Sequence, residues 1–379
     1  MRKLQWLEIQ NYRGIKQAKF ENFGDINMIV GRNNTGKSTI LESVYLNITA
    51  HDRDLVGNVP IRLIFRRRGI LRSREKSLER DDIFRYLGYI FYQGNAEIEA
   101  KFNSNLGEYS LKVLKEKIPD DTLELVKSYL ERKRRLLEIE IGDLLFVVVD
   151  NLQRPVMIAF EVIFEGKSEY MIQFILPYHP VFKEKLPLKQ ERRNVIVVDS
   201  HLLLNYDVFE GSAIKAALMR IERYARINKD KLIKFLSDQL EEDIVTVESK
   251  LFDVYAITKD DRSIPFSLLG DGTKVSLIYF YALSLKNSYI LFEEPENHLH
   301  PKLISKCADL MVKSSKRNQI FITTHNLELL QVILEKAKEY NVNLKIYSTT
   351  CLRDGILKCE SYDLDEAYTA VNKIGVDLR

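Results

Sequence analysis

The chain has 379 residues, of which 45% are hydrophobic and 29% are charged, so it is long enough to bury one large domain or two modest ones. Its 57 Lys and Arg residues nearly balance its 54 Asp and Glu residues, and the net charge of +3 excludes a global field that would by itself demand nucleic acid. Three cysteines without a C-x-x-C pair, Cys307, Cys351 and Cys359, favour reduced thiols over disulfides or zinc. With no signal peptide and no apolar stretch of bilayer-spanning length, we expect a cytoplasmic protein that does not enter a membrane.

The first motif in chain order is a phosphate-binding loop. Residues 31 to 39 match the pattern G-x-x-x-x-G-K-[ST], after an apolar run at 26 to 30 and before a helix-like run at 40 to 46. Glycines let successive backbone N–H groups converge on phosphates, and a helix that starts near Lys37 adds its positive dipole end. We therefore expect a nucleoside triphosphate here, with Lys37 bridging the β- and γ-phosphates and Ser38 holding Mg²⁺. The predicted nucleotide-binding residues of this Walker A loop are Gly31, Asn33, Asn34, Thr35, Gly36, Lys37, Ser38 and Thr39.

A basic segment follows at residues 61 to 82, where positively charged residues are interleaved with Phe65 and Leu71. Such a cluster can neutralise several phosphates of a nucleic acid. The alternative, which the sequence leaves open, is a solvated loop or a protein-docking face. The candidate DNA-binding residues are Arg62, Arg66, Arg67, Arg68, Arg72 and Arg74.

The middle of the chain predicts strands and then helix. Strand-like runs at 89 to 102 and 144 to 150 precede a predicted hairpin of 157 to 164 with 170 to 176, which suits an antiparallel β-layer. Residues 120 to 140 indicate a charged helix, and residues 212 to 242 an amphipathic helical segment. A distant likeness of Asp150, Glu165 and Lys167 to the acid-acid-lysine pattern of metal-dependent nucleases is better explained by a hairpin turn at Glu-Gly-Lys.

Near the other end of the chain, two strands end in residues suited to hydrolysis. The strand at 289 to 293 reads as a Walker B strand and ends in adjacent carboxylates. Phosphoryl transfer needs one carboxylate near the metal and one to orient or deprotonate water, roles that suit Glu293 and Glu294 respectively. The strand at 319 to 324 ends at His325, whose imidazole would sense the γ-phosphate.

Between the two halves of this predicted site lies a glycine-rich loop. Gly270, Asp271 and Gly272 precede a helix-like apolar stretch and would present exposed N–H groups to a phosphate. Taken alone, Gly-Asp-Gly before a helix is usually a capping loop.

The ordered set of these motifs resembles the ABC-class ATPase heads of the SMC, RecF and OLD type. Residues 7 to 15 look like the first strand and turn of that group, whose basic residue near the phosphates corresponds to Arg13. Residues 294 to 301 are similar to its extended Walker B and D-loop, a position that explains His298 and His300 better than a metal site does. The match is specific over residues 1 to 50 and 260 to 345.

The resemblance implies an α/β P-loop NTPase fold: an ABC-type ATPase head with a mixed sheet, an antiparallel β-layer and a helical insertion. Residues 1 to 50 and 264 to 379 would form the ATPase core. Residues 51 to 263 would form an insertion, with the β-layer at about 85 to 180 and a helical lobe at about 200 to 250.

The resemblance also implies a homodimer that sandwiches ATP and Mg²⁺, in which each signature loop contacts the γ-phosphate bound by the other protomer. Two positions depart from the pattern, because Gly270 stands where a serine is usual and Glu293 where an aspartate is usual. Too little chain follows the head for a Toprim nuclease domain, so DNA cleavage would need a separate nuclease or effector subunit.

The leading function is an ATP hydrolase that drives or gates a DNA repair or antiviral-defence complex. The alternative is a nucleotide-dependent switch that acts on a protein partner without nucleic acid. The long insertion and the poor signature match disfavour a transporter subunit.

Overall fold

The structure is a computed structural model, and it describes a set of segments that covers both ends of the chain and much of its middle. These are residues 1–49, 53–67, 87–95, 98–114, 140–150, 155–164, 167–174, 193–199, 218–219, 221–225, 227–250, 253–375 and 377–378. Most of the predicted basic segment and nearly all of the predicted helix at 120 to 140 lie outside the described residues.

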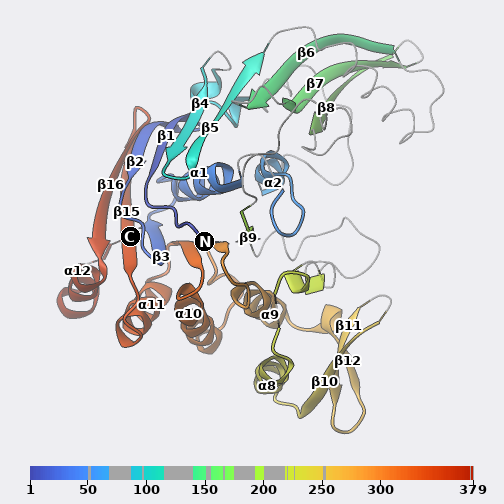
Figure 1. The fold of residues 1–379 in the computed structure, drawn as a ribbon, viewed down its shortest axis with the longest axis vertical. Coiled ribbons are helices and arrows are strands. Elements are labelled where there is room, and N and C mark those ends of the chain that lie inside the picture. The colour runs from blue at the N-terminus through green and yellow to red at the C-terminus, as the bar shows by residue number, and fades with distance from the viewer. Residues whose placement is uncertain are drawn as a thin grey trace.

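A mixed sheet runs through the molecule (Figure 1). Its strands are β1 (Leu7–Tyr12), β2 (Ile15–Phe20), β3 (Ile26–Gly31), β4 (Ala100–Ser104), β5 (Gly107–Leu114), β6 (Glu140–Asp150), β7 (Pro155–Phe164), β8 (Lys167–Phe174), β9 (Val195–Asp199), β13 (Tyr289–Glu293), β14 (Gln319–Thr324), β15 (Leu344–Arg353) and β16 (Ile356–Asp363). Within the described residues their order is β8-β7-β6-β5-β4-β1-β2-β16-β15-β3-β14-β13-β9. The fold is that of an α/β P-loop NTPase, as the sequence predicts.

Five strands at one end of this sheet, β15, β3, β14, β13 and β9, pair in parallel. Parallel strands that are covered on both faces are apolar throughout, and do not alternate apolar with polar residues. Strand β13 is an example. Tyr289 and Leu291 belong to the core cluster on the side of α1 (Lys37–Thr49), whereas Ile290 and Phe292 belong to the cluster on the opposite side. Because the strands are parallel, their carboxyl ends meet at one edge, where ligands bind in such sheets.

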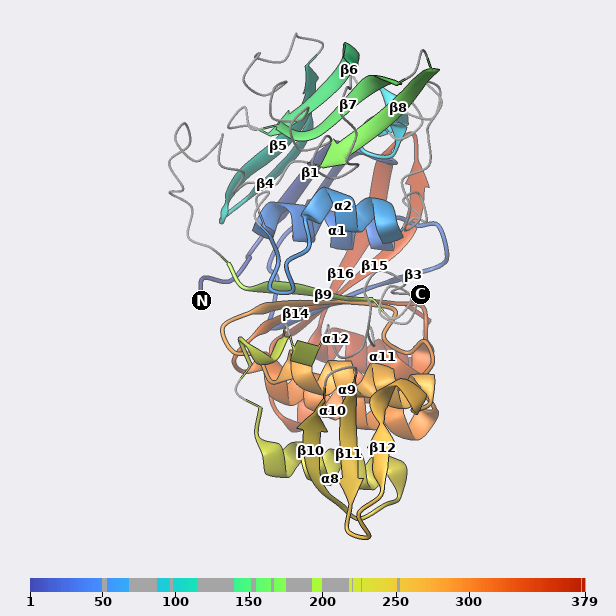
Figure 2. The same ribbon diagram turned by 90° about the vertical axis from the view of Figure 1, so that its right-hand side faces the viewer.

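Helices cover both faces of the parallel strands (Figure 2). On one face, α1 and α2 (Pro60–Arg67) lie beneath β1, β4 and β5. On the other face lie α9 (Asp271–Leu283), α10 (Pro301–Ser315), α11 (Leu327–Glu339) and, near the C-terminus, α12 (Leu364–Tyr368). No helix in the described part of the chain is both long and apolar enough to cross a membrane.

The antiparallel β-layer is formed by β4 to β8, which continue outward from β1. The predicted hairpin is confirmed, because β7 pairs with β8 in antiparallel register. The strand predicted at 89 to 102 is wrong in its first half, since β4 starts only at Ala100 and a short 3-10 turn occupies Tyr92–Gly94. In this turn Gln93 and Gly94 both have positive φ angles, a conformation that ends an extended strand.

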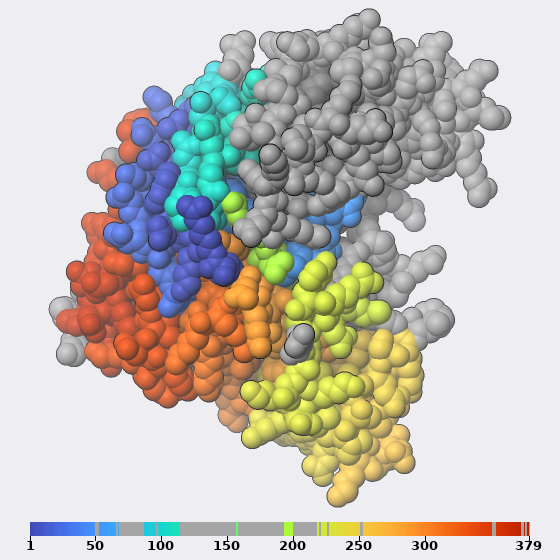
Figure 3. Space-filling model, in the orientation of Figure 1, coloured from blue at the N-terminus to red at the C-terminus, as the bar shows by residue number. Residues whose placement is uncertain are grey.

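A small lobe lies at the opposite end of the molecule from the β-layer (Figure 3). It holds α8 (Lys229–Leu240) and an antiparallel sheet of β10 (Ile244–Ser249), β11 (Val254–Thr258) and β12 (Ser263–Pro265). The amphipathic segment predicted at 212 to 242 is not one helix. Asn228 is extended and caps α8 by accepting a hydrogen bond from the Lys231 N–H at 3.0 Å, which starts a new helix there.

The strand β9 was not anticipated from the sequence. It comes from the middle of the region assigned to the insertion, yet it pairs in register with the Walker B strand from Val195↔Tyr289 to Asp199↔Glu293. We therefore propose that the ATPase core comprises residues 1 to 50, β9 and residues 264 to 379, and that the rest of 51 to 263 forms the insertion.

The turn that leads into α2 is organised by a buried carboxylate. Asp54 accepts hydrogen bonds from the Tyr45 hydroxyl at 3.0 Å, the Asn58 N–H at 2.7 Å and Asn58 Nδ2 at 2.9 Å. The adjacent Leu55 N–H donates to Val195 O of β9 at 2.9 Å. Burial raises the pKa of Asp54 to about 6, although these hydrogen bonds oppose the shift. Folding raises the pKa of such a carboxyl, so the folded state favours its neutral form. Its contribution to the stability of the folded state is therefore lost at pH values where the carboxyl ionises.

We predict that Asp54 makes the stability of the protein pH-dependent. The contribution is fully present below the pKa of Asp54 in the unfolded chain, and it falls as the pH rises toward about 6. The free energy of unfolding in urea should be measured at about pH 4.5 and about pH 7.5. Between these values it should fall by roughly 2 kcal/mol more for the native chain than for Asp54→Asn. Equal pH dependence of the two proteins would contradict the assignment.

Candidate active site

The Walker A loop connects the end of β3 to the start of α1. Lys37 Nζ donates to Gly31 O and to Arg32 O, both at 2.8 Å, and so closes the loop around its own ammonium group. Burial lowers the pKa of Lys37, against the opposing field of carboxylates at the ends of neighbouring segments. A desolvated ammonium held by backbone carbonyls can turn its donors to phosphate oxygens.

Thr349, on β15, supports the loop from outside. Its hydroxyl donates to Val30 O at 2.9 Å and shares a hydrogen bond with the Thr35 hydroxyl at 2.7 Å. Gly31 has a φ of +148°, and a Cβ there would lie 2.3 Å from the Thr349 hydroxyl oxygen. The loop therefore requires glycine at this position. No local signal in the sequence marks Thr349, because it reaches the loop only through the pairing of β15 with β3.

Ser38 and Glu293 meet where the start of α1 faces the end of β13. The Ser38 hydroxyl donates to Glu293 Oε1 at 2.5 Å. A hydroxyl and a carboxylate are the hard oxygen donors that Mg²⁺ takes in phosphate-binding sites, so these residues fit the predicted metal site. Glutamate in place of the usual aspartate is accommodated, because its second oxygen has an ion-pair partner of its own, Arg67.

Glu294 and His325 also lie together. His325 Nδ1 is 3.1 Å from Glu294 Oε1, and Asn297 Nδ2 donates to the other carboxylate oxygen, Oε2, at 3.2 Å. The Glu294 N–H donates to Thr323 O of β14 at 3.0 Å, and the φ of Glu294 is +43°. The carboxylate is thus fixed at both oxygens, while the Glu294 and His325 side chains stay 28% and 46% exposed. Water can reach this pair, as a general base requires.

Glu296, to which no role is assigned from the sequence, forms a buried connection behind this pair. Its Oε1 accepts a hydrogen bond from the Thr324 hydroxyl at 2.5 Å and from the His325 N–H at 3.4 Å. Its Oε2 is buried without a hydrogen-bond partner among the residues that the structure describes. Burial raises the pKa of this carboxyl. Glu296 ties the D-loop to the strand end that carries His325.

Two of the predicted arginines form ion pairs with carboxylates, which contradicts the prediction for Arg67 and leaves that for Arg13 a prediction. Arg67 is not a surface residue available to DNA: its side chain is 6% exposed and pairs with Glu42, Asp199 and Glu293. Arg13, predicted near the phosphates, forms an ion pair with Glu42, which lies one turn of α1 beyond Ser38.

The remaining members of the predicted basic patch are only partly described. Arg62, on the same helix as Arg67, is exposed. The side chain of Arg66 and all of Arg68, Arg72 and Arg74 lie outside the described residues.

The glycine-rich signature loop opens α9. Gly270 occupies the N-cap without a side-chain cap on the helix, and a Cβ there would meet nothing within 4 Å. Leu268, two residues earlier, is 80% exposed. Gly272 is required for packing, since a Cβ there would lie 2.7 Å from His298 O in the D-loop. Asp271 lies in the first turn, and a phosphate contact by these three residues stays a prediction.

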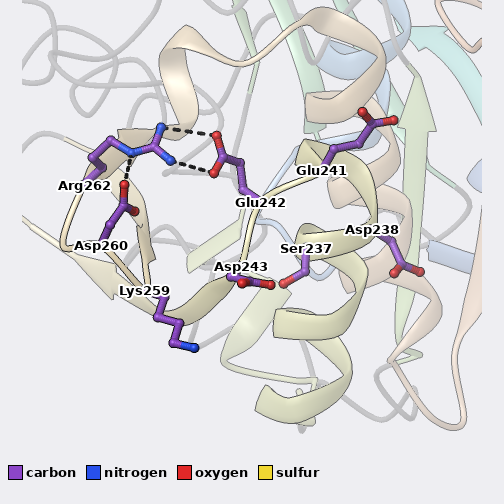
Figure 4. A pocket seen from close by; sticks show the side chains of 8 residues that line it. All are labelled: Ser237, Asp238, Glu241, Glu242, Asp243, Lys259, Asp260 and Arg262. Atoms are coloured by element: carbon purple, nitrogen blue, oxygen red, sulfur yellow. Dashed lines mark hydrogen bonds and ion pairs between the residues drawn. The ribbon is translucent and has the colours of Figure 1, made fainter.

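A surface hollow lies away from these residues, in the small lobe between α8, β10 and the turn before β12 (Figure 4). Its lining is mostly charged, and it includes none of the predicted site residues. The lining residues are Ser237, Asp238, Glu241, Glu242, Asp243, Lys259, Asp260 and Arg262.

Comparison with known protein families identifies ATPase domains on both halves of the chain. A family model described as "AAA ATPase domain" matches residues 3–131. A second, described as "AAA domain, putative AbiEii toxin, Type IV TA system", matches residues 175–331.

Individual relatives and a solved structure are similar to all or part of the chain. MJECL11 of Methanocaldococcus jannaschii, an uncharacterized protein, is 33% identical over 115 residues, which are 29% of this chain and 99% of that protein. An ATP/GTP phosphatase of Helicobacter pylori is 22% identical over 89% of each chain. The DNA replication and repair protein RecF of Staphylococcus haemolyticus is 23% identical over 46% of this chain and 45% of RecF, so the match spans about half of RecF. A solved SMC head bound to the C-winged helix domain of ScpA has a TM-score of 0.48 at 14% identity, over 97% of this chain and 99% of that one.

Each half of the chain therefore carries a match to an AAA ATPase domain. Taken with the RecF and ATP/GTP phosphatase relatives, these matches identify an ATPase head of the ABC, SMC and RecF type.

We predict that Gly31→Ala disrupts the Walker A loop. The added Cβ would meet both the hydroxyl and the backbone oxygen of Thr349, at 2.3 and 2.4 Å, so the loss of stability should be roughly 3 kcal/mol and ATP affinity should fall by at least about tenfold. Chemical unfolding and a fluorescent-ATP titration measure the two effects. Gly88→Ala is the matched control, because its Cβ would have only an ordinary 3.6 Å contact; similar behaviour of the two variants would show that Thr349 does not constrain the loop.

Proposed function

We propose that this protein binds Mg-ATP, dimerises around it and hydrolyses it, and that it thereby drives or gates a DNA repair or antiviral-defence complex. The observation that carries the proposal is the meeting of two pairs at one edge of the sheet. Ser38 contacts Glu293 at 2.5 Å, and Glu294 contacts His325 at 3.1 Å. The first pair suits a metal and the second an attacking water.

In the proposed reaction, Lys37 and the N–H groups of the loop bind the β- and γ-phosphates. Ser38 and Glu293 would hold Mg²⁺, which neutralises charge on the phosphates when bound. Glu294 orients the attacking water and accepts its proton, while Asn297 keeps the carboxylate in place. His325 contacts the same carboxylate and is placed to report whether a γ-phosphate is present.

The signature loop supports dimerisation. An open helix start with unfilled N–H groups is an anion-binding end, and Gly270 leaves it sterically accessible. The 80% exposed Leu268 beside it is an apolar side chain that a second protomer would cover. In ABC-type heads such loops lie across a dimer, and this resemblance supports a second copy of this chain as the proposed occupant.

The DNA context rests on the RecF relatives, which are named for DNA replication and repair, and on the basic segment that begins on α2. With Arg67 committed to buried ion pairs, the candidate contacts are Arg62, Arg66, Arg68, Arg72 and Arg74. A separate nuclease or effector subunit would perform any cleavage. The alternative is a switch acting on a protein partner, which the toxin–antitoxin description of one matching family favours.

We predict that Glu294→Gln retains ATP binding and loses at least about 100-fold in turnover, because the water loses its proton acceptor. The steady-state ATPase rate should be measured with and without double-stranded DNA, single-stranded DNA and RNA, with this variant as the blank. Stimulation by one nucleic acid supports the DNA context. A basal rate indifferent to all three supports the protein-gated switch, and no rate above the blank would refute hydrolysis by this chain alone.

Charge reversal at Arg62, Arg72 and Arg74 completes that experiment. Loss of nucleic-acid binding with normal basal turnover would assign the contact to this segment. Unchanged binding would place it elsewhere.

We predict that Leu268→Asp prevents the ATP-dependent dimer. In the Glu294→Gln background, light scattering should show a dimer when Mg-ATP is added, and the additional Leu268→Asp change should leave a monomer that still binds ATP. Val245→Asp is the matched control, since Val245 is a 50% exposed residue of the small lobe. A dimer that persists with Leu268→Asp would rule out the signature loop as the contact.

A further inference from the structure

Arg67 lies at the centre of three carboxylates that come from three different elements. Its Nη2 is 2.7 Å from Glu293 Oε2 at the end of β13, and its Nε donates to Asp199 Oδ2 at 2.9 Å at the end of β9. Its Nη1 is 3.5 Å from Glu42 Oε1 on α1. The exposed fractions of these side chains are 6% for Arg67, 0% for Glu42, 8% for Asp199 and 13% for Glu293.

Arg67 supplies part of the positive charge that these carboxylates face. Glu42 is also paired with Arg13, so among the described residues two guanidinium groups meet three carboxylates, and Glu293 also interacts with the Lys37 ammonium. Burial lowers the pKa of Arg67, but the carboxylates of Glu293, Glu42 and Asp199 outweigh it and hold the pKa above its ordinary value. Without Arg67 this buried place would be one unit of charge more negative, and buried charges need partners.

Glu293 is shared between this cluster and the predicted metal site. Its Oε1 accepts from the Ser38 hydroxyl at 2.5 Å, while its Oε2 faces Arg67. Asp199 is the register partner of Glu293 in the sheet, so both carboxylates stand at the same strand-end edge. A cation bound between these two carboxylates would neutralise the charge that the Arg67 guanidinium neutralises now.

We propose that Arg67 is a positioning residue, which holds Glu293 toward Ser38 and supplies the positive charge that keeps a free divalent cation out of the site. This rests on the proposed function, because it takes Ser38 and Glu293 as the ligands of Mg²⁺. ATP brings negative charge of its own, so the metal enters with the phosphates and not before them. Metal binding is thereby made conditional on the nucleotide.

The test uses the metal alone, without nucleotide. Mn²⁺ is titrated into the full chain, and unbound Mn²⁺ is followed by electron paramagnetic resonance. Arg67→Gln should bind Mn²⁺ at least about tenfold tighter than the native chain, because its site is one unit of charge more negative and so attracts a divalent cation more strongly. Arg67→Lys, which keeps the charge, should bind like the native chain. Arg67→Gln should also melt at a lower temperature, and millimolar Mg²⁺ should restore much of that loss.

Arg262→Gln is the matched control. Arg262 also pairs with two carboxylates, Glu242 and Asp260, both at 2.6 Å, but in the open hollow of the small lobe (Figure 4). Since solvent compensates those charges, this variant should gain no Mn²⁺ binding and no Mg²⁺-dependent stability.

Three results would overturn the proposal: Mn²⁺ binding by Arg67→Gln that is no tighter than native, Mn²⁺ binding by Arg67→Lys as tight as that of Arg67→Gln, or an Arg67→Gln chain that stays insoluble even when prepared with Mg²⁺. Absence of ATP turnover in the native chain would refute the proposed function and leave this test standing, because no nucleotide is used in it.

Discussion

The parallel pairing of β9, β13, β14 and β3 is the constraint on which the site depends. Its register aligns Asp199 with Glu293, Glu293 with Thr323, and Thr323 with Ile29. Residues that are more than two hundred positions apart in the sequence therefore lie together at one edge of the sheet. Because each strand is buried on both faces, a shift in register would draw polar strand ends such as Glu293 into the apolar layer, where an unpaired charge is costly.

Buried charge is the second organising feature. Glu42, Asp199, Glu293 and Glu296 are carboxylates with little access to water, in a site that must later receive polyanionic phosphate. Such groups are tolerated only when paired or hydrogen-bonded. Arg67 and Arg13 satisfy three of them, and the Thr324 hydroxyl and the His325 N–H bond the fourth. The same pairs fix the positions of the residues that we propose as a metal ligand and a general base.

These pairs also join parts of the chain that would otherwise be independent. Arg67 is the last residue of α2, so the region inserted after the Walker A helix reaches the Walker B carboxylate directly. On the opposite side, Tyr279 of α9 donates to Pro295 O at 3.1 Å, and Gly272 packs on His298. The signature helix is thus attached to the D-loop, and the D-loop carries Asn297 and Glu296 to the catalytic pair. The proposed nucleotide site is therefore in direct contact with α2 on one side and is connected to α9 through the D-loop on the other.

The sequence by itself determined the Walker A loop, the Walker B strand and the strand ending at His325. Each of these motifs consists of contiguous residues that can be recognised locally. Glycines indicate a tight loop, an unbroken apolar run indicates a buried parallel strand, and polar groups directly after the run indicate the site at the strand end. The fold class followed from the order of these segments. The hairpin of β7 and β8 was also predictable from its alternation and turn.

Only the tertiary structure decided the surroundings of those residues. An arginine in a basic run looks the same in sequence whether it faces solvent or three carboxylates, and so the sequence groups Arg67 with candidate DNA contacts although its side chain is buried in ion pairs. Asp199, Glu42 and Thr349 carry no local mark, because their roles arise from strand pairing and helix packing across long separations. Local patterns encode backbone conformation and burial, whereas the partners of a buried charge are set by which segments the sheet brings together.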